Sequence, residues 1–406
     1  MLKKIPVSQL RLGMYIHELC GSWMNHQFWK SSFLLKEPKD LGRLEQSSIT
    51  EVWIDTAKGL DLELKGQTTQ EADAEVTDLL TKIEATPQDK APKRVSVVKE
   101  MQQAARICAR SKEAVTTMFH EARMGKAVNT EGVANLVEEI SSSISRNPGA
   151  LISLARLKTA DDYTYMHSVA VCALMVALAR QLKLDETQTR DAGRAGLMHD
   201  LGKAMMPIEV LNKPGKLTDH EFAIMKKHPV DGHRLLVEGN CQFPLVLDVC
   251  LHHHEKVDGT GYPDGLQDQQ ISLPAKMGAV CDVYDAITSN RPYKAGWDPA
   301  ESVRKMSEWC KGHFDERIFQ AFVRSIGIYP IGSLVKMASN RLAVVIEQSG
   351  DSLLTPVVKV FLAVKSRSYI TPEVLDLSKP EAKDKIVSRE DPVKWGIKNL
   401  EQLWMS

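Results

Sequence analysis

The stretch DETQTRDAGRAGLMHDLGK, residues 185–203, decides how this chain is interpreted. Asp185 is a residue type that begins helices, and we expect a helix from there to about Asp200, with His199 and Asp200 at its end. Neighbouring residues on a helix point about 100° apart, but both can reach one ion where the helix ends and the backbone turns. An imidazole nitrogen together with a carboxylate oxygen suits Fe, Mn, Zn or Ni better than Ca or Mg. The stretch therefore predicts part of a transition-metal site.

Histidines are crowded around this pair, since eight of the twelve in the chain lie between His167 and His254. Inward-facing histidines and carboxylates from facing helices are how helical bundles build dinuclear metal sites. Each such residue alone is more often a core or surface residue, so the prediction depends on the whole set. The set comprises His167 on a helix starting near Asp161, His228 on the helix opened by Thr218, His252, His253 and His254 at the end of the next helix, and Asp282 on a helix opened by Pro274.

The hydrophobic pattern predicts a mainly α protein with a small α/β domain at the N-terminus and a β-rich extension at the C-terminus. Strands are expected at 14–16, 33–35 and 52–54, and again at 334–335, 342–346 and 357–364. Polar residues and two prolines between 67 and 95 favour a linker. The predicted organisation is a regulatory or docking domain at 1–66, a linker at 67–95, connecting helices at 96–149, a catalytic helical domain at 150–326 and the extension at 327–406.

The charge balance and the apolar runs exclude several classes of protein. The 406 residues include 52 basic and 52 acidic side chains, so we expect no DNA partner, since such proteins usually carry a basic excess. The longest apolar run, 169–179, is too short to span a bilayer, and no apolar signal segment follows Lys3 and Lys4. Seven cysteines without a CxxC pair favour reduced thiols. We expect a cytoplasmic protein without a membrane span.

Seven motifs between about 150 and 310 resemble, in order, those of the HD-GYP phosphodiesterases. The motifs are DYTYMHS at 162–168, HDLGK at 199–203, KPGKLT at 213–218, MKKHP at 225–229, HHEKVDGTGYP at 253–263, DVYDA at 282–286 and RPYK at 291–294. More loosely, the first 66 residues resemble a domain of unknown function that often precedes HD-GYP domains. The resemblance implies an HD-type helical bundle and a bacterial phosphoric diester hydrolase that converts cyclic di-GMP to pGpG, and often onward to GMP.

The resemblance also implies a ligand set for two metals, with Asp200 as the bridge between them. The set is His167, His199, Asp200, His228, His253, His254 and Asp282. His252 is the extra member of its triplet, because the following motif fixes the register on the next two histidines.

Some members of the family hold a third metal with a Glu four residues before the histidine that matches His167. This chain has Tyr163 there, a poor ligand when protonated, so we expect two metals rather than three. Asp161 or Asp162 is the alternative third-metal ligand. Fe or Mn is the metal that the resemblance implies, with Ni or Zn as alternatives.

The chemistry follows from two metals and needs no covalent protein nucleophile. Two ions about 3.5–4 Å apart lower the pKa of a bridging water and bind phosphoryl oxygens. We hypothesise that the bridging hydroxide attacks phosphorus and that the 3′-oxygen leaves. Asp200 and Lys203 are the predicted catalytic residues, with Lys203 near a phosphate. Arg291 and Lys294 are expected to hold the second phosphate, since Arg offers a two-pronged contact and Lys a point charge.

Two further groups are expected beside the metals. Asp285, one turn after Asp282, is predicted to orient a metal ligand or Lys203. Gly261, Tyr262 and Pro263 form a tight turn at the rim of the site. The resemblance suggests that this turn acts in substrate shape and in docking partner signalling domains.

Other functions stay open on the sequence alone. HD-type bundles also hold di-iron oxygenases and nucleotide phosphohydrolases, but the Gly-Tyr-Pro segment favours a cyclic dinucleotide. The substrate could instead be cyclic GMP-AMP, or the protein could be a catalytically silent sensor or adaptor that binds a cyclic dinucleotide. The predicted partners are the cyclic dinucleotide, signalling proteins and a second copy of the chain in a homodimer.

Overall fold

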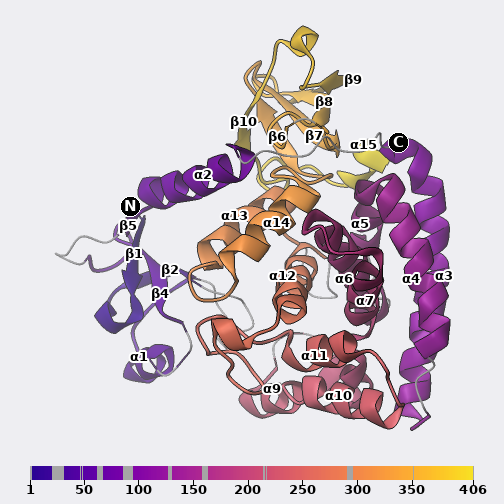
Figure 1. Ribbon diagram of the computed structural model, residues 1–406. Helices are drawn as coiled ribbons and strands as arrows, with labels where there is room; N and C mark the ends of the chain where they lie inside the picture. Colours follow the sequence, from indigo (N-terminus) through magenta and orange to yellow (C-terminus); the bar gives the residue numbers. More distant parts are fainter. Residues whose placement is uncertain are drawn as a thin grey trace.

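A computed structural model describes residues 2–20, 32–45, 47, 49–61, 67–85, 95–126, 130–157, 163–213, 215, 217–289, 296–350 and 352–405. Within these residues the protein is mainly α, with a small β-sheet near each end of the chain (Figure 1). The predicted fold class is therefore confirmed at this level. None of the helices in the described residues is long and apolar enough to cross a membrane.

The N-terminal sheet has its own hydrophobic core. Its strands, in the order β3-β2-β4-β1-β5, are β1 (Leu2–Pro6), β2 (Tyr15–Leu19), β3 (Phe33–Leu34), β4 (Glu51–Asp55) and β5 (Gln67–Thr68). Helix α1 (Pro38–Glu45) adds the buried Leu44 to a core that contains Ile5, Ile16 and Ile54. The strands predicted at 14–16, 33–35 and 52–54 are confirmed to within a few residues.

Helix α2 (Thr69–Ala85) corrects the prediction of a linker over the first part of 67–95. Val76, Leu80 and Ile83 are buried, and their spacing of four and three residues places them along one helical stripe. This stripe packs near α13 and α14 of the helical domain. Three apolar residues among many polar ones are a weak signal in the sequence but suffice to dock a helix. Residues 86–94, which contain the two prolines, lie outside the described residues.

The helical domain is built around α6. Its helices are α3 (Val97–Arg123), α4 (Thr130–Arg146), α5 (Pro148–Arg156), α6 (Tyr163–Gln181), α7 (Glu186–Met198), α8 (Ile208–Leu211), α9 (Asp219–Met225), α10 (His228–Glu238), α11 (Pro244–His252), α12 (Leu273–Thr288), α13 (Pro299–Trp309) and α14 (Glu316–Ile326). Residues 169–179 of α6 are all buried, because α3, α4, α5, α7, α12 and α14 pack around it. The longest apolar run of the chain is thus a central core helix.

Capping residues define several helix starts, as the sequence predicts. The side chain of Asp185 accepts a hydrogen bond from the backbone N–H of Gln188 at 2.8 Å, and Thr218 and Glu221 form a capping box at the start of α9. One prediction is wrong, since His228 is the first residue of α10 and does not lie on the helix opened by Thr218. That helix, α9, ends at Met225, and Pro229 stands in the first turn of α10, where a missing N–H is tolerated.

The C-terminal sheet shares its apolar residues between two cores. Its strands, in the order β10-β6-β7-β8-β9, are β6 (Leu334–Met337), β7 (Arg341–Glu347), β8 (Val357–Ala363), β9 (Ser368–Asp376) and β10 (Ile386–Arg389). On β7, Leu342 and Val344 belong to the core of the helical domain, whereas Ala343 and Val345 belong to a separate core. Alternate residues of a strand face opposite sides, so one face of the sheet packs on the helices. Helix α15 (Glu401–Met405) also packs against β7.

A glycine permits the closest backbone approach near the centre of the helical domain. Gly202 lies in the 3-10 helix η3 (Leu201–Met205), which packs on α10. A Cβ atom on Gly202 would lie 1.9 Å from the backbone oxygen of His228 and 2.5 Å from the backbone nitrogen of Gly232. Any side chain there must push η3 and α10 apart. Glycine at 202 therefore allows His228 to lie beside His199 and Asp200.

We predict that Gly202→Ala lowers the free energy of unfolding by about 1–3 kcal/mol, as overpacking of a core usually does. Gly42→Ala is the matched control, because Gly42 lies in α1 and a Cβ there meets nothing within 4 Å. Alanine in a helix should stabilise it by up to about 1 kcal/mol. Thermal unfolding followed by circular dichroism measures both variants. Equal midpoints for Gly202→Ala and the unmodified chain would contradict the close approach.

Candidate functional site

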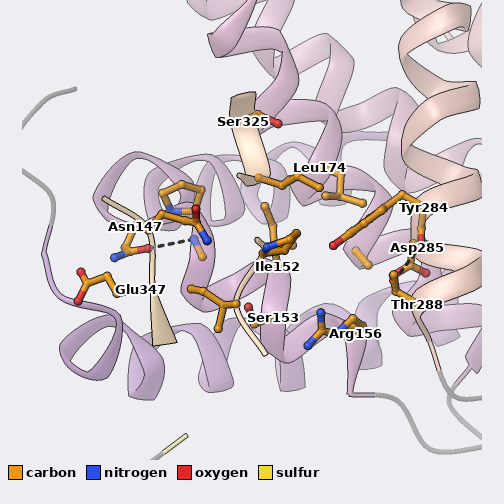
Figure 2. Close-up of a pocket in the computed structure, with 17 residues that line it drawn as sticks. Asn147, Ile152, Ser153, Arg156, Leu174, Tyr284, Asp285, Thr288, Ser325 and Glu347 are labelled. Carbon is orange, nitrogen blue, oxygen red and sulfur yellow. Dashed lines mark hydrogen bonds between the residues drawn. The ribbon is translucent and has the colours of Figure 1, made fainter. Parts of the chain in front are cut away.

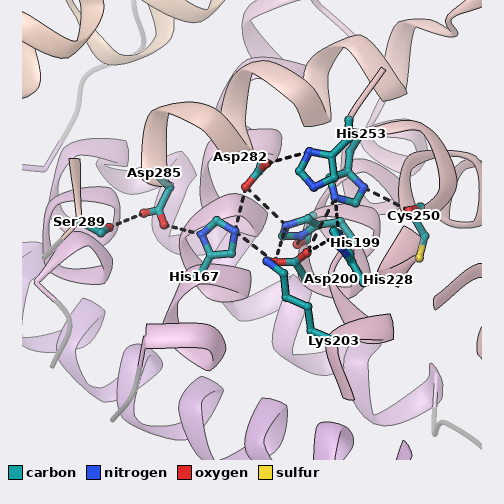
Figure 3. A network of polar contacts seen from close by, with 12 residues as sticks. His167, His199, Asp200, Lys203, His228, Cys250, His253, Asp282, Asp285 and Ser289 are labelled. Carbon is teal, nitrogen blue, oxygen red and sulfur yellow. Dashed lines mark hydrogen bonds and ion pairs between the residues drawn. The ribbon is translucent and has the colours of Figure 1, made fainter. Parts of the chain in front are cut away.

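The structure brings together the seven residues predicted as metal ligands (Figure 3). All are buried, and they come from five regions of the helical domain. His167 lies on α6, His199 and Asp200 follow α7, His228 starts α10, His253 and His254 follow α11, and Asp282 lies on α12. Most of them stand at helix ends, where the turning backbone lets adjacent side chains face one point.

The Asp200 carboxylate lies between two groups of histidines. Its Oδ2 atom is 3.4 Å from Nε2 of His167 and 3.3 Å from Nε2 of His199. Its Oδ1 atom is 3.2 Å from Nε2 of His228 and 3.8 Å from Nε2 of His253. Each oxygen of one carboxylate thus faces a different pair of imidazoles.

Asp282 and His254 complete the two groups. Oδ1 of Asp282 is 2.9 Å from Nε2 of His167, and Oδ2 is 3.8 Å from Nδ1 of His254. Ligand atoms of His167, His199 and Asp282 lie within 4.8 Å of one another, and the same holds for those of Asp200, His228, His253 and His254. The cluster therefore divides into two compact sets of nitrogen and oxygen atoms.

Hydrogen bonds on the outer side of the rings orient the histidines. The Nδ1 atoms of His199, His228 and His253 lie 2.7, 2.8 and 3.0 Å from the backbone oxygens of Gly196, Met225 and Val249. A backbone oxygen only accepts, so each Nδ1 donates and the lone pair of Nε2 is directed at the cluster. This arrangement is typical of metal-binding histidines.

Asp285 orients His167 in the same way. Its Oδ2 atom lies 2.6 Å from Nδ1 of His167, and Ser289 donates a hydrogen bond to its Oδ1 atom at 3.2 Å. Asp285 is predicted beside a metal ligand or beside Lys203, and the structure brings it to His167.

The electrostatics of the cluster differ between its two groups of histidines. Burial lowers the pKa of His167, but hydrogen bonds to Asp200, Asp282 and Asp285 outweigh this effect and raise the pKa to about 10. Burial raises the pKa of Asp200, but Lys203 and the nearby histidines lower it well below its usual value. Burial and the imidazoles of His199 and His228 lower the pKa of His253 to about 3, so His253 is neutral, as a metal ligand must be.

Two atoms of the cluster lack a hydrogen-bond partner in the described residues, namely Nε2 of His199 and Oδ1 of Asp200. Buried polar atoms without partners are rare and mark strain or a missing ligand. Imidazole nitrogens and carboxylate oxygens together form the donor set of divalent Fe, Mn, Ni or Zn. The residues therefore fit a pair of transition-metal ions.

Comparison with known proteins identifies the family. A model of a domain of unknown function, DUF3391, matches residues 2–133, and an HD domain model matches residues 138–318. Cyclic di-GMP phosphodiesterase PA4108 of Pseudomonas aeruginosa is 54% identical over 405 residues, which cover 100% of this chain and 96% of that protein. This chain belongs to the HD-GYP family. The resemblance predicted from the motifs is thereby confirmed.

Other relatives match over about half of this chain. Cyclic di-GMP phosphodiesterase response regulator RpfG of Xanthomonas campestris pv. campestris is 38% identical over 179 residues, 42% of this chain and 47% of that protein. The 3'3'-cGAMP-specific phosphodiesterase 1 of Vibrio cholerae serotype O1 is 33% identical over 213 residues, 52% of this chain and 45% of that protein. The names of these relatives thus include both cyclic dinucleotides.

The predicted substrate contacts of this HD-GYP chain are placed only in part. Lys203 lies on η3, and its ammonium pairs with Oδ2 of Asp200. The Lys203 side chain is 20% exposed, and its ammonium end is directed at Asp200. Arg291 and Lys294 lie outside the described residues. Asp161 and Asp162, the alternative ligands of a third metal, also lie outside them, and Tyr163 is the first residue of α6.

The Gly-Tyr-Pro segment of the HD-GYP motif lies against the cluster. The Tyr262 ring stacks on the His254 ring, with centroids 4.7 Å apart and planes inclined by 28°. A Cβ atom on Gly261 would lie 2.4 Å from Cα of Glu255, which explains the glycine. Pro263 follows Tyr262 through a cis peptide bond.

Glu255 holds this segment, although it is not among the site residues predicted from the sequence. Its carboxylate accepts backbone hydrogen bonds from Asp264, Gly265 and Leu266 at 2.7, 3.1 and 3.0 Å. The sequence does offer one signal for Glu255, because this acidic residue directly follows two histidines predicted as metal ligands. Lys256 is a second residue that is not predicted from the sequence. It is buried two residues after His254, and burial lowers its pKa to about 8.

His252 points away from the cluster. Its Nδ1 atom lies 2.7 Å from Oδ1 of Asp248, and its Nε2 atom lies 3.2 Å from Oδ2 of Asp264. The register predicted from the HD-GYP motif leaves His252 out of the ligand set, and the geometry agrees with that assignment.

A separate cavity lies beside the cluster and is lined in part by Asp285 (Figure 2). Arg156, Tyr284 and Thr288 contribute to its wall, together with Asn147 and other residues of α5, α6 and α12. Asp285 thus contacts His167 and also lines this cavity.

We predict that Glu255→Gln loosens the segment at 264–266. The amide of glutamine has a single acceptor oxygen and no charge, and a hydrogen bond to a charged group contributes about 1.5–3 kcal/mol. Hydrogen–deuterium exchange of these backbone amides should be at least about tenfold faster. Glu238→Gln is the control, because Glu238 is exposed at the end of α10. Unchanged protection in Glu255→Gln would show that the carboxylate does not hold the segment.

Proposed function

We propose that this protein is a metal-dependent cyclic di-GMP phosphodiesterase that releases pGpG, and then GMP, and so lowers the level of this second messenger. The observation that carries the proposal is the position of the Asp200 carboxylate, with one oxygen toward His167 and His199 and the other toward His228 and His253. The 54% identity to a cyclic di-GMP phosphodiesterase over nearly all of both chains supports the choice of substrate.

The proposed ligand sets follow the two groups of the cluster. His167, His199 and Asp282 would hold one divalent ion, and His228, His253 and His254 the other, with Asp200 shared between them. Fe or Mn is the proposed metal, and Ni or Zn are the alternatives that the donor atoms also accept. Two such ions supply a low-pKa water as the nucleophile and positive charge for the phosphoryl oxygens.

The protein's own side chains bind and orient the substrate. The Lys203 ammonium lies next to Asp200, on a side chain that is 20% exposed, and would contact a phosphoryl oxygen of the scissile diester. The pair of Asp285 and Ser289 keeps Nε2 of His167 directed at the cluster. Arg291 and Lys294 are proposed to bind the second phosphate.

Cyclic GMP-AMP is the second candidate substrate, because a relative named for it is 33% identical over 213 residues. A catalytically silent sensor is disfavoured, since all seven predicted ligand residues are present and lie together. Binding of signalling proteins, formation of a homodimer and a cytoplasmic location stay predictions from the sequence.

The deciding experiment is anaerobic purification of the full chain, metal quantification and product analysis with cyclic di-GMP and cyclic GMP-AMP. We expect two equivalents of metal per chain and conversion of cyclic di-GMP to pGpG or GMP. Chelation should abolish turnover, and Fe or Mn should restore it. Absence of turnover with Fe, Mn and Ni, or full activity of the metal-free protein, would overturn the proposal.

The three consecutive histidines supply an internal control for the ligand assignment. We predict that His253→Gln and His254→Gln bind fewer than two metals and lose about 100-fold or more in kcat, because a metal contributes several kcal/mol to phosphoryl transfer. His252→Gln should keep both metals and most of the activity, since His252 bonds to Asp248 and Asp264 instead. Loss of metal in His252→Gln would show that the register is wrong.

A further inference from the structure

A lysine beside the cluster lies near two aromatic rings. The ammonium of Lys226 is 5.0 Å from the ring centroid of Phe222 and 5.2 Å from that of Tyr262. Lys226 caps the C-terminus of α9, two residues before His228, and its side chain is exposed. The three residues therefore form a small polar and aromatic surface at the rim of the site.

Lys226 makes no ion pair within 4.0 Å among the residues that the structure describes. Other lysines near charged neighbours do, since Lys203 pairs with Asp200, Lys276 with Asp268 and Lys305 with Glu18. An ammonium held by rings rather than by a carboxylate keeps its three N–H donors available for a ligand.

The surface adjoins the proposed metal site through Tyr262. The Tyr262 ring stacks on His254, with centroids 4.7 Å apart. In a nucleotide the base is separated from its phosphate by one ribose. A base whose phosphate lies at the cluster would therefore reach the rings and the ammonium beyond His254.

The chemistry of these three side chains selects among bases. Aromatic side chains stack on any base, with about 1–3 kcal/mol per base, so they contribute affinity without sequence preference. The ammonium only donates hydrogen bonds. Guanine offers two acceptors, O6 and N7, on one edge, whereas adenine places an amino donor beside N7. A lysine at this position accepts guanine and repels the amino group of adenine.

We infer that Phe222, Lys226 and Tyr262 form a guanine-binding subsite that sets the base preference of the enzyme. The inference rests on the proposed function and deepens it. Cyclic di-GMP places a guanine in the subsite in either of its two orientations, whereas cyclic di-AMP places an adenine there in both. Cyclic GMP-AMP satisfies it in one orientation only, so hydrolysis of that substrate should give mainly one of its two linear isomers.

The test compares kcat/KM for cyclic di-GMP and cyclic di-AMP in the metal-loaded full chain. The unmodified protein should prefer cyclic di-GMP, and Lys226→Met should reduce the ratio of the two kcat/KM values by about tenfold. Lys226→Arg should retain the preference, because Arg also donates to O6 and N7. Lys227→Met is the matched control, since Lys227 is the exposed neighbour and its side chain makes no capping hydrogen bond to α10.

Product analysis with cyclic GMP-AMP is a second readout of orientation. One linear isomer should dominate with the unmodified protein, and both should form with Lys226→Met. Metal content measured on each variant shows whether the site is intact. An unchanged substrate ratio and isomer pattern in metal-loaded Lys226→Met would overturn the guanine subsite and leave the proposed function standing. Hydrolysis of neither cyclic dinucleotide by the unmodified protein would overturn both.

Discussion

The buried carboxylate of Asp200 is the constraint on which the rest of the helical domain depends. An ionised carboxylate away from water is strongly unfavourable unless cations or hydrogen-bond donors surround it. Lys203 and His167, whose pKa is raised, supply positive charge beside it. His199, His228 and His253 direct Nε2 lone pairs at the same carboxylate and would meet the requirement through bound metal ions. These residues come from α6, the end of α7, η3, α10 and the end of α11. The close packing of η3 on α10 follows from the same need, because a larger residue than Gly202 would hold His228 away from Asp200. The same packing of helices therefore forms both the site and the core around it.

Much of this arrangement could be predicted from local sequence. Helix starts follow from side chains that cap their own backbone, as Asp185 does for α7, and such contacts are independent of distant residues. The adjacent ligands His199 and Asp200 could be predicted for a similar reason, since a helix end is visible in the sequence. The motif order then identified the family, which in turn implied the complete set of seven residues.

The remaining features depend on tertiary contacts that leave weak signals. The docking of α2 depends on three apolar residues in a polar segment. Their role is evident only from the contact of α2 with α13 and α14. The start of α10 at His228 depends on where α9 ends, and Pro229 alone does not define that position in the sequence. The carboxylate of Glu255 accepts hydrogen bonds from backbone N–H groups nine to eleven residues later, and no sequence pattern indicates these hydrogen bonds. The equal numbers of basic and acidic residues likewise hide the local charge of Lys203 and Lys226 beside the cluster.

Strand β7 has a consequence for the modularity of the chain. Its alternate residues belong to the core of the helices and to the core of the C-terminal sheet, so neither core is complete without it. Elements that share a core unfold together rather than in separate steps. The change from helices to strands after α14 therefore does not mark a detachable module. A helical domain recombined with another C-terminal partner would have to replace the apolar face that Leu342 and Val344 provide.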